Sequence, residues 1–490
     1  MILDVLFALG LLVSPASQLR LAGSPVGPGE VCLLIWIVLT LGREATRLGP
    51  SLTPALSRLL IFWSLFALAQ SLGTLTAYVI ADEHDPRWFL HDVFAYTLLA
   101  VVSCLSVLDP HAAPRLHRVA WLLSALGTPF LALQLANAWG LINIASVDPW
   151  WWDQFRGWSA NPHQLAVLCT VLGIVSLHLA ETATRLGTRI AAVACAIVPI
   201  CAAKLTKSDS FSLILVTAGP IFMAFKFRIW LVSRTPRITF RSAFAWIVVL
   251  ALPVAVVSAA PLAYSIAIEV EDFAKAMARE NPVQTEEKAE LRFELWGQAA
   301  RRGFESGMLG LGPGPHLEIP PSIVAQRQID AAHPKYVEHP QLTLVPNFEA
   351  HNTLLDLFTQ GGLLVVLSFI WIVATAFSVA YQAGRAGLPT LLCTLCIYAV
   401  ATLIIRHPIF WFAIALCLVA RREPIARLRS GTEGNVVGGI VGLLPSPRKV
   451  LVPSQPRAAH GASKADVRSC ELGGWTALNL RHGGADAVDG

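Results

Sequence analysis

Charged side chains are scarce in this chain, and their scarcity indicates its class. Asp, Glu, Lys and Arg make up 14% of the 490 residues, whereas hydrophobic residues make up 55%. Soluble domains carry roughly 25% charged residues. Most apolar runs are long enough for a helix to cross about 30 Å of hydrocarbon. The composition therefore excludes an ordinary soluble protein and predicts an all-α polytopic membrane protein.

Patterns typical of disulfide frameworks, metal sites and nucleotide sites are also missing. The long hydrophilic loop, residues 266–350, contains no cysteine. Cys393 and Cys396 form a CxxC inside an apolar run without nearby histidines, so we interpret them as small apolar residues. The run GMLGLGPGPH lacks the Lys-Ser/Thr of a P-loop and predicts a turn rather than a phosphate cradle. We therefore expect no metal and no cofactor.

The hydrophobic runs predict about twelve spans. Because the first run carries Asp4 and no basic segment precedes it, we expect a retained span rather than a cleaved signal peptide. The predicted organisation is spans one to nine within 1–265, the loop 266–351, spans ten to twelve within 352–421, and a disordered cytoplasmic tail, 422–490. The spans lie near residues 2–15, 29–42, 57–79, 89–108, 119–140, 163–181, 187–203, 211–226, 242–265, 352–380, 388–405 and 408–421.

Basic residues gather on alternate connections, and this predicts sidedness. By the positive-inside rule, the connections that carry Arg43, Arg115, Arg185 and Arg385 face the cytoplasm. The long loop then lies outside the cytoplasm, and twelve spans place both termini inside. Because topology accounts for most of the net charge of +5, no nucleic-acid partner is expected. The spans themselves are expected to be almost free of buried charge.

The long loop carries a helical segment and ends at a His-Asn pair. The run 285–302 predicts a helix with Thr285 as N-cap and Gly303 at its end, on which Arg292 and Trp296 share a face. His351-Asn352 then opens an apolar helix. An imidazole at a membrane boundary can transfer protons, and the neighbouring amide either orients it or, as we favour, caps the helix.

Two shorter connections on the same side supply further polar groups. RGWSANPHQLA contains Arg156 and Asn161, and KLTKSDSFSL contains Lys207. Arg406 lies at another boundary on that side. Taken singly, each cation is expected to reach lipid headgroups, and a lone His to cap a helix. Together they are what binding of a diphosphate requires.

Four motifs follow one another along the chain, which are RGWSANPHQLA, TKSDS, RFELWGQA with LGLGPGPH, and HNTLLDLFTQGG. By the order of these motifs, the chain resembles the bacterial O-antigen ligase and polysaccharide polymerase superfamily over roughly residues 150–375. The resemblance implies a GT-C type glycosyltransferase of the inner membrane that needs neither metal nor nucleotide sugar. Its donor would be an undecaprenyl-diphosphate-linked glycan, used on the periplasmic face. Its acceptor would be lipid A-core in lipopolysaccharide biosynthesis, or a second lipid-linked glycan in O-antigen or exopolysaccharide polymerisation. Membrane lipids and other polysaccharide export or assembly proteins are further candidate partners.

The resemblance also assigns roles to residues. It implies that His351 is the base on the acceptor hydroxyl and that Arg292 contacts the diphosphate. Many members carry Ser-Arg where this chain has Ser208-Asp209, so we expect Lys207 or Arg156 to supply the second cation. Transfer by direct displacement would invert the anomeric centre. The alternative is a lipid-linked glycan flippase or another transporter, which would place charges inside several spans.

Overall fold

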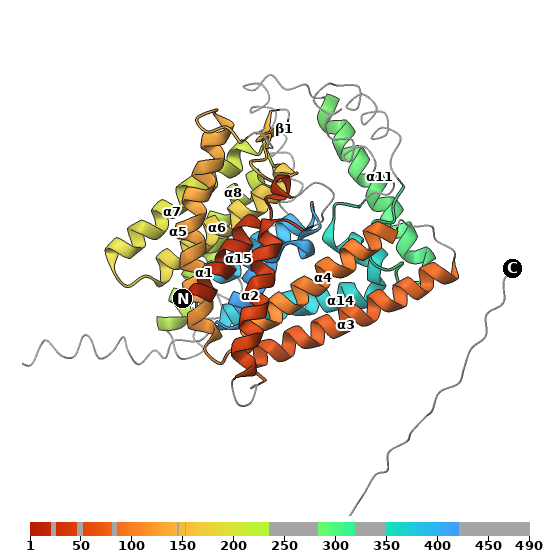
Figure 1. The fold of residues 1–490 in the computed structure, drawn as a ribbon, viewed down its shortest axis with the longest axis horizontal. Helices are drawn as coiled ribbons and strands as arrows, with labels where there is room; N and C mark the ends of the chain where they lie inside the picture. The colour runs from red at the N-terminus through yellow and green to blue at the C-terminus, as the bar shows by residue number, and fades with distance from the viewer. Residues whose placement is uncertain are drawn as a thin grey trace, which may run out of the picture. The chain divides into compact units, whose positions relative to one another are not determined.

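The computed structural model describes residues 1–20, 26–46, 52–80, 86–144, 147–151, 153–234, 283–318 and 349–420, and these are mostly helical (Figure 1). All of them belong to the unit formed by residues 1–424. Within the described ranges, strands occur only as the hairpin of β1 (Trp150–Trp151) and β2 (Gln154–Phe155). The predicted all-α class is confirmed for this part of the chain.

Seven described helices are long and apolar enough to cross a membrane. They are α3 (Pro54–Val79), α4 (Pro86–Leu108), α5 (Ala112–Ala138), α6 (Pro162–Thr182), α7 (Leu186–Leu205), α8 (Asp209–Arg234) and α14 (Thr353–Gln382). Four other helices also coincide with predicted spans, namely α1 (Ile2–Val13), α2 (Pro28–Ala45), α15 (Gly387–Ala399) and α16 (Pro408–Leu418). The predicted ninth span, 242–265, and the tail, 422–490, lie outside the described residues. The count of twelve therefore stays a prediction, as does the sidedness.

The interior is built around α6, and an aromatic cluster joins two further helices. α6 contacts α5, α7 and α15 and is apolar on nearly every side, the pattern of an enclosed helix. Trp411 of α16 packs against Phe62 and Trp63 of α3, with ring centroids 5.1 and 4.5 Å apart. α3 also packs along α14, and Figure 1 shows these two helices side by side. This packing places the N-terminal end of α14 beside the helices that complete the candidate site.

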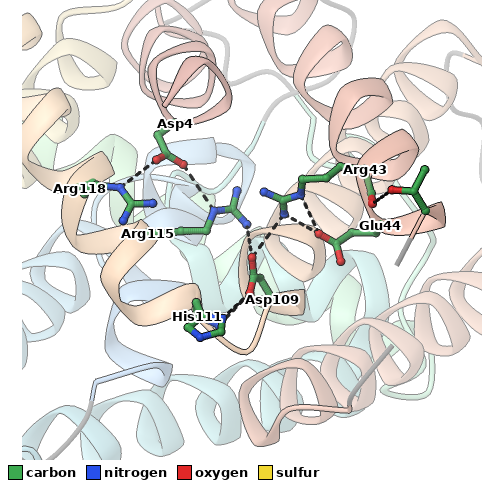
Figure 2. A network of polar contacts seen from close by, with 8 residues as sticks. Asp4, Arg43, Glu44, Asp109, His111, Arg115 and Arg118 are labelled. Carbon is green, nitrogen blue, oxygen red and sulfur yellow. Dashed lines mark hydrogen bonds and ion pairs between the residues drawn. The ribbon is translucent and has the colours of Figure 1, made fainter. Parts of the chain in front are cut away.

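A polar network joins α1, α2 and α5 at the arginine-rich side (Figure 2). Asp4 accepts from Arg115 and Arg118 at 3.5 and 3.1 Å. Arg115 and Arg43 both pair with Asp109, at 3.5 and 3.6 Å. The arginines that predict sidedness therefore also hold three helices together.

The expectation that the spans are almost free of buried charge is wrong. Asp4, Asp92 and Asp356 are buried in α1, α4 and α14, within the predicted spans 2–15, 89–108 and 352–380. An ion in an apolar interior requires a partner, because the loss of hydration costs several kcal/mol. Each of these groups has such partners, supplied by side chains or backbone amides.

The predicted loop helix is α11 (Val283–Glu305), but both of its predicted ends are wrong. Thr285 lies in the first turn rather than at the N-cap, and the helix continues past Gly303. A Cβ atom on Gly303 would overlap the ring of Phe358 on α14. The glycine therefore serves the close approach of two helices rather than helix termination.

α14 is broken at Gly361–Gly362, where Gly362 has a φ of 63°. Directly before the break, the carbonyl groups of Thr359 and Gln360 accept hydrogen bonds from the amides of Leu311 and Gly312, each at 2.7 Å. The Gly-rich run is thus a loop, as predicted, and it docks on the break in α14.

Candidate active site

His351 lies in a tight turn at the start of α14. Its backbone has a φ of 51°, in the left-handed region that residues other than glycine rarely occupy. The side chain of Asn352 accepts hydrogen bonds from the amides of Leu354 and Leu355, at 3.1 and 3.3 Å. The capping interpretation of Asn352 is confirmed. A residue held in this backbone region costs about 1–3 kcal/mol and needs support from its surroundings.

Two buried or half-buried side chains support the turn. The carboxylate of Asp356 accepts from the amides on either side of His351, Ala350 N at 2.7 Å and Asn352 N at 3.1 Å. The indole of Trp296, on α11, donates to Ala350 O at 3.1 Å. The backbone around His351 is therefore fixed from α14 and α11 together.

α11 brings Arg292 to this turn. Leu295 and Ala299 of α11 pack with Ala350 in a small apolar cluster. Arg292 lies one helical turn before Trp296, and its charge acts on the imidazole of His351. Among the described residues, no carboxylate pairs with Arg292. The structure thus brings together the two residues to which the resemblance gives chemical roles.

The surroundings keep His351 in its neutral form. Burial lowers the pKa of the imidazole because the protonated ring loses hydration. Glu349 opposes this effect and raises the pKa, whereas Arg292 and Arg406 lower it further. The net direction is downward. A neutral imidazole has a lone pair that can accept a proton.

Arg406 has a different role from the one expected of it. It ends the short helix η3 (Ile404–Arg406) and pairs with Glu349 and with Asp92 of α4. Its pKa is raised: burial opposes this, but the two carboxylates outweigh it. His91 Nδ1 lies 3.2 Å from the second oxygen of Asp92. Arg406 is therefore neutralised inside the protein rather than held available for a substrate phosphate.

Arg156 and Lys207 also have carboxylate partners. Arg156 is buried, donates to Asp148 O at 2.9 Å and pairs with the carboxylate of the same residue at 3.4 Å. Lys207 pairs with Asp153. Asn161 caps α6. These residues form a second group around the β1–β2 hairpin, and their part in substrate binding stays a prediction.

Sequence reasoning missed the carboxylates of the site. Glu349 and Asp92 carry no motif, although an acidic residue inside an apolar run such as HDVFAYTLLA is itself a signal that a partner must exist. Asp356 also carries no motif, and it lies within an apolar predicted span. In the described part of the chain, no group of three His, Cys, Asp or Glu side chains is placed to hold a metal ion.

Residues 191–370 match the family model described as O-Antigen ligase. This region is therefore similar to an O-antigen ligase domain. The matched region begins in α7 and ends in α14, so it includes Arg292, Trp296 and His351. The resemblance seen in TKSDS, RFELWGQA with LGLGPGPH, and HNTLLDLFTQGG is thereby confirmed, whereas RGWSANPHQLA precedes the matched region. No curated protein and no solved structure matches the chain.

The O-antigen ligase domain and the apolar helices together indicate a multi-pass membrane protein. The family implies a glycosyltransferase-like enzyme, with lipid-linked glycans and lipid A-core as the general classes of substrate. Within the domain, the described geometry brings a neutral imidazole close to an arginine that no described carboxylate neutralises.

Proposed function

We propose that this protein transfers or polymerises undecaprenyl-diphosphate-linked glycans on the outer face of the bacterial inner membrane. The supporting observation is that His351, whose pKa is lowered, lies within electrostatic reach of Arg292 inside the region that matches the O-antigen ligase family. The long loop would be periplasmic and both termini cytoplasmic, in accord with the distribution of arginine. The reaction would use no metal and no cofactor, and it would invert the anomeric centre.

His351 would act as the general base. As the acceptor hydroxyl attacks the anomeric carbon, its proton passes to a ring nitrogen of the neutral imidazole of His351. The bond from that carbon to the diphosphate oxygen breaks, and its electron pair leaves with undecaprenyl diphosphate. A positioned base contributes roughly 10²- to 10⁴-fold to such a rate.

Arg292 would bind the diphosphate. A planar guanidinium donates two parallel hydrogen bonds to phosphate oxygens and stabilises the charge that grows on the leaving group. Because no described carboxylate occupies Arg292, a phosphate would not have to displace one. Arg156 and Lys207 would supply further contacts only after exchange with Asp148 and Asp153.

The acceptor would be either lipid A-core or a second lipid-linked glycan. Both are amphipathic lipids that the membrane delivers to the same face, so the site at the start of α14 is suited to either. Ligation and polymerisation require the same base and the same leaving group. Other polysaccharide export or assembly proteins would supply the donor or remove the product.

A lipid-linked glycan flippase is the alternative, and one observation favours it. Asp92 and Asp356 are buried inside helices that coincide with predicted spans, and buried charge is frequent in transporters. In this structure, however, Asp92 pairs with Arg406 and Asp356 accepts two backbone amides. Both carboxylates therefore have structural partners, and transfer chemistry remains the better supported function.

Deletion of the gene, followed by sizing of surface and lipid-linked glycans, tests the proposal. A polymerase null leaves single repeats, a ligase null leaves long unattached chains, and a flippase null leaves the glycan on the cytoplasmic face. His351→Ala is expected to reproduce the null, whereas His111→Ala, at an exposed histidine on the arginine-rich side, should restore wild-type glycans. Wild-type glycan length and attachment with His351→Ala would reject the base assignment.

A further inference from the structure

Asp92, Arg406 and Glu349, which lie far apart in sequence, are linked by two ion pairs beside His351. Arg406 pairs through one terminal nitrogen with Glu349 and through the other with Asp92. The Asp92 side chain is 0% exposed, and those of Arg406 and Glu349 are 20% and 23% exposed. The guanidinium is therefore shared between a residue of the catalytic turn and a residue of α4.

Because Glu349 is close to His351 in sequence, its ion pair with Arg406 affects the protonation of the imidazole. Glu349 lies two residues before His351, and its negative charge favours the protonated imidazole. Arg406 acts in the opposite direction, because a cation disfavours a second positive charge nearby. Pairing with Arg406 offsets the charge of Glu349 at short range. The protonation of His351 thus depends on a balance between these two residues.

Hydrogen bonds of Thr353 also hold the segment that carries Arg406 against the start of α14. Thr353, at the start of α14, accepts from Ile404 N at 3.0 Å and donates to Thr402 O at 2.5 Å. The segment 402–406 is therefore attached to the start of α14 by its backbone, while Arg406 attaches to Glu349 by its side chain. These contacts hold the two residues in a fixed relation.

We propose that Arg406 is a positioning residue that neutralises Glu349 and thereby keeps His351 in the state that accepts a proton. Asp92 completes the arrangement, because it holds the second arm of the guanidinium and orients the first toward Glu349. This inference rests on the proposed function for its catalytic meaning. The charge relation itself is a property of the folded protein and can be measured without any substrate.

The other ionisable groups around His351 do not reproduce this balance. Arg292 of α11 lowers the pKa of the imidazole but is reserved in the proposed mechanism for the diphosphate. His407 adjoins Arg406, and burial lowers its pKa to about 4, so it adds no charge at neutral pH. The carboxylate of Asp356 accepts the amides on both sides of His351. Arg406 and Glu349 are therefore the pair whose removal changes the charge near the ring in opposite directions.

The test is the pH dependence of hydrogen–deuterium exchange at the imidazole C2 of His351, measured by mass spectrometry on the full-length protein in nanodiscs. This exchange reports the pKa of one histidine and needs no glycan. Arg406→Gln should raise the midpoint, because it removes a cation and exposes the charge of Glu349. Glu349→Gln should lower it. A change of about one pH unit is expected for a unit charge several ångströms away at an effective dielectric constant of about 20.

Two further variants separate charge from folding. Arg406→Lys keeps the charge and should leave the midpoint close to the wild-type value. The double variant Arg406→Gln with Glu349→Gln removes both charges and should return the midpoint toward the wild type. Arg302→Gln is the matched control, since Arg302 lies at the end of α11 and pairs with the exposed Glu318 at 3.8 Å. It should leave the midpoint unchanged.

Opposite shifts in Arg406→Gln and Glu349→Gln support the inference. Shifts in the same direction, or unchanged midpoints in both, overturn it. If Arg406→Gln does not fold, Glu349→Gln alone decides, because an unchanged or raised midpoint there contradicts the charge balance. If the midpoints shift as expected while His351→Ala retains glycan transfer, the charge relation stands and the proposed base role fails.

Discussion

The indole nitrogen of Trp296 donates a hydrogen bond to the carbonyl oxygen of Ala350, 3.1 Å away. The contact ties the loop helix α11 to the residue directly before His351, although 54 residues separate the two in sequence. It therefore couples the position of Arg292, one turn earlier on α11, to the position of the imidazole. The proposed base, His351, and the proposed phosphate-binding residue, Arg292, are therefore held in fixed positions relative to each other.

Trp296→Phe keeps most of the apolar ring and removes the donor. Because one hydrogen bond contributes about 1 kcal/mol, glycan transfer is expected to fall by roughly 3- to 10-fold while the protein stays folded. Trp139→Phe, at an indole that is 62% exposed at the end of α5, provides the matched control. Equal transfer rates in the two variants would show that the contact does not position the site.

The buried histidine next to Arg406 predicts a pH-dependent stability. Burial, followed by the charge of Arg406, lowers the pKa of His407 to about 4 in the folded protein, whereas an unfolded chain titrates near about 6.5. Below the unfolded value, the unfolded chain binds a proton that the folded protein does not. Stability is therefore full above about pH 6.5 and falls toward about pH 4, by at most about 3 kcal/mol from this residue.

His407→Gln should reduce that loss, which thermal unfolding in detergent between about pH 7 and pH 5 measures. His111→Gln is the comparison, because the side chain of His111 is 83% exposed. The same loss of melting temperature in the wild type and in His407→Gln would contradict the assignment.

Local signals predicted the parts of the site that depend on neighbours in sequence. Asn352 caps α14 because a short polar side chain at a loop-to-helix boundary bonds to amides two or three residues ahead. Arg292 and Trp296 share a face because four residues make about one helical turn. Both inferences need only the periodicity of a helix.

Long-range partners could not be predicted in this way. Arg406 meets Asp92 across 314 positions in sequence, and no local pattern specifies which carboxylate an arginine will contact. The Gly361–Gly362 break was hidden inside a run long enough to be one continuous span. Gly303 was misinterpreted as a helix end, because a glycine needed for close packing has the same sequence signature as one that ends a helix.

The break in α14 predicts different costs for alanine at two glycines that both have a positive φ. Gly362 and Gly384 have φ values of 63° and 72°. A Cβ atom on Gly362 would overlap the backbone of Met308, whereas one on Gly384 would meet nothing within 4 Å. Both alanine variants carry backbone strain because of the positive φ, and Gly362, with a ψ of −159°, lies in a region that only glycine normally adopts. Gly362→Ala must also displace the docked loop. Its melting temperature should fall well below that of Gly384→Ala, and equal values would show that the loop does not need the break.

The network in Figure 2 predicts a stability role for the first helix. Asp4→Asn removes one of the two carboxylates that face the buried Arg115. Breaking one side of a buried pair costs about 3–5 kcal/mol, and because Asp109 still pairs with Arg115 we expect a loss below that range. Arg118→Gln is the control, because its side chain is 56% exposed and exposed pairs contribute about 0–1 kcal/mol. Detergent-solubilised protein should unfold at a lower temperature in the first variant only. Similar melting temperatures would mean that the network does not hold α1.

The most direct test of the central claim is the release of undecaprenyl diphosphate by the purified protein in nanodiscs, with lipid-linked glycans extracted from the host membrane as donor. His351→Ala is expected to lower the release rate by roughly 10²-fold or more, with folding unchanged. Arg292→Lys should also lower it, because a point charge does not replace a planar guanidinium. Release at the wild-type rate by His351→Ala would contradict the account.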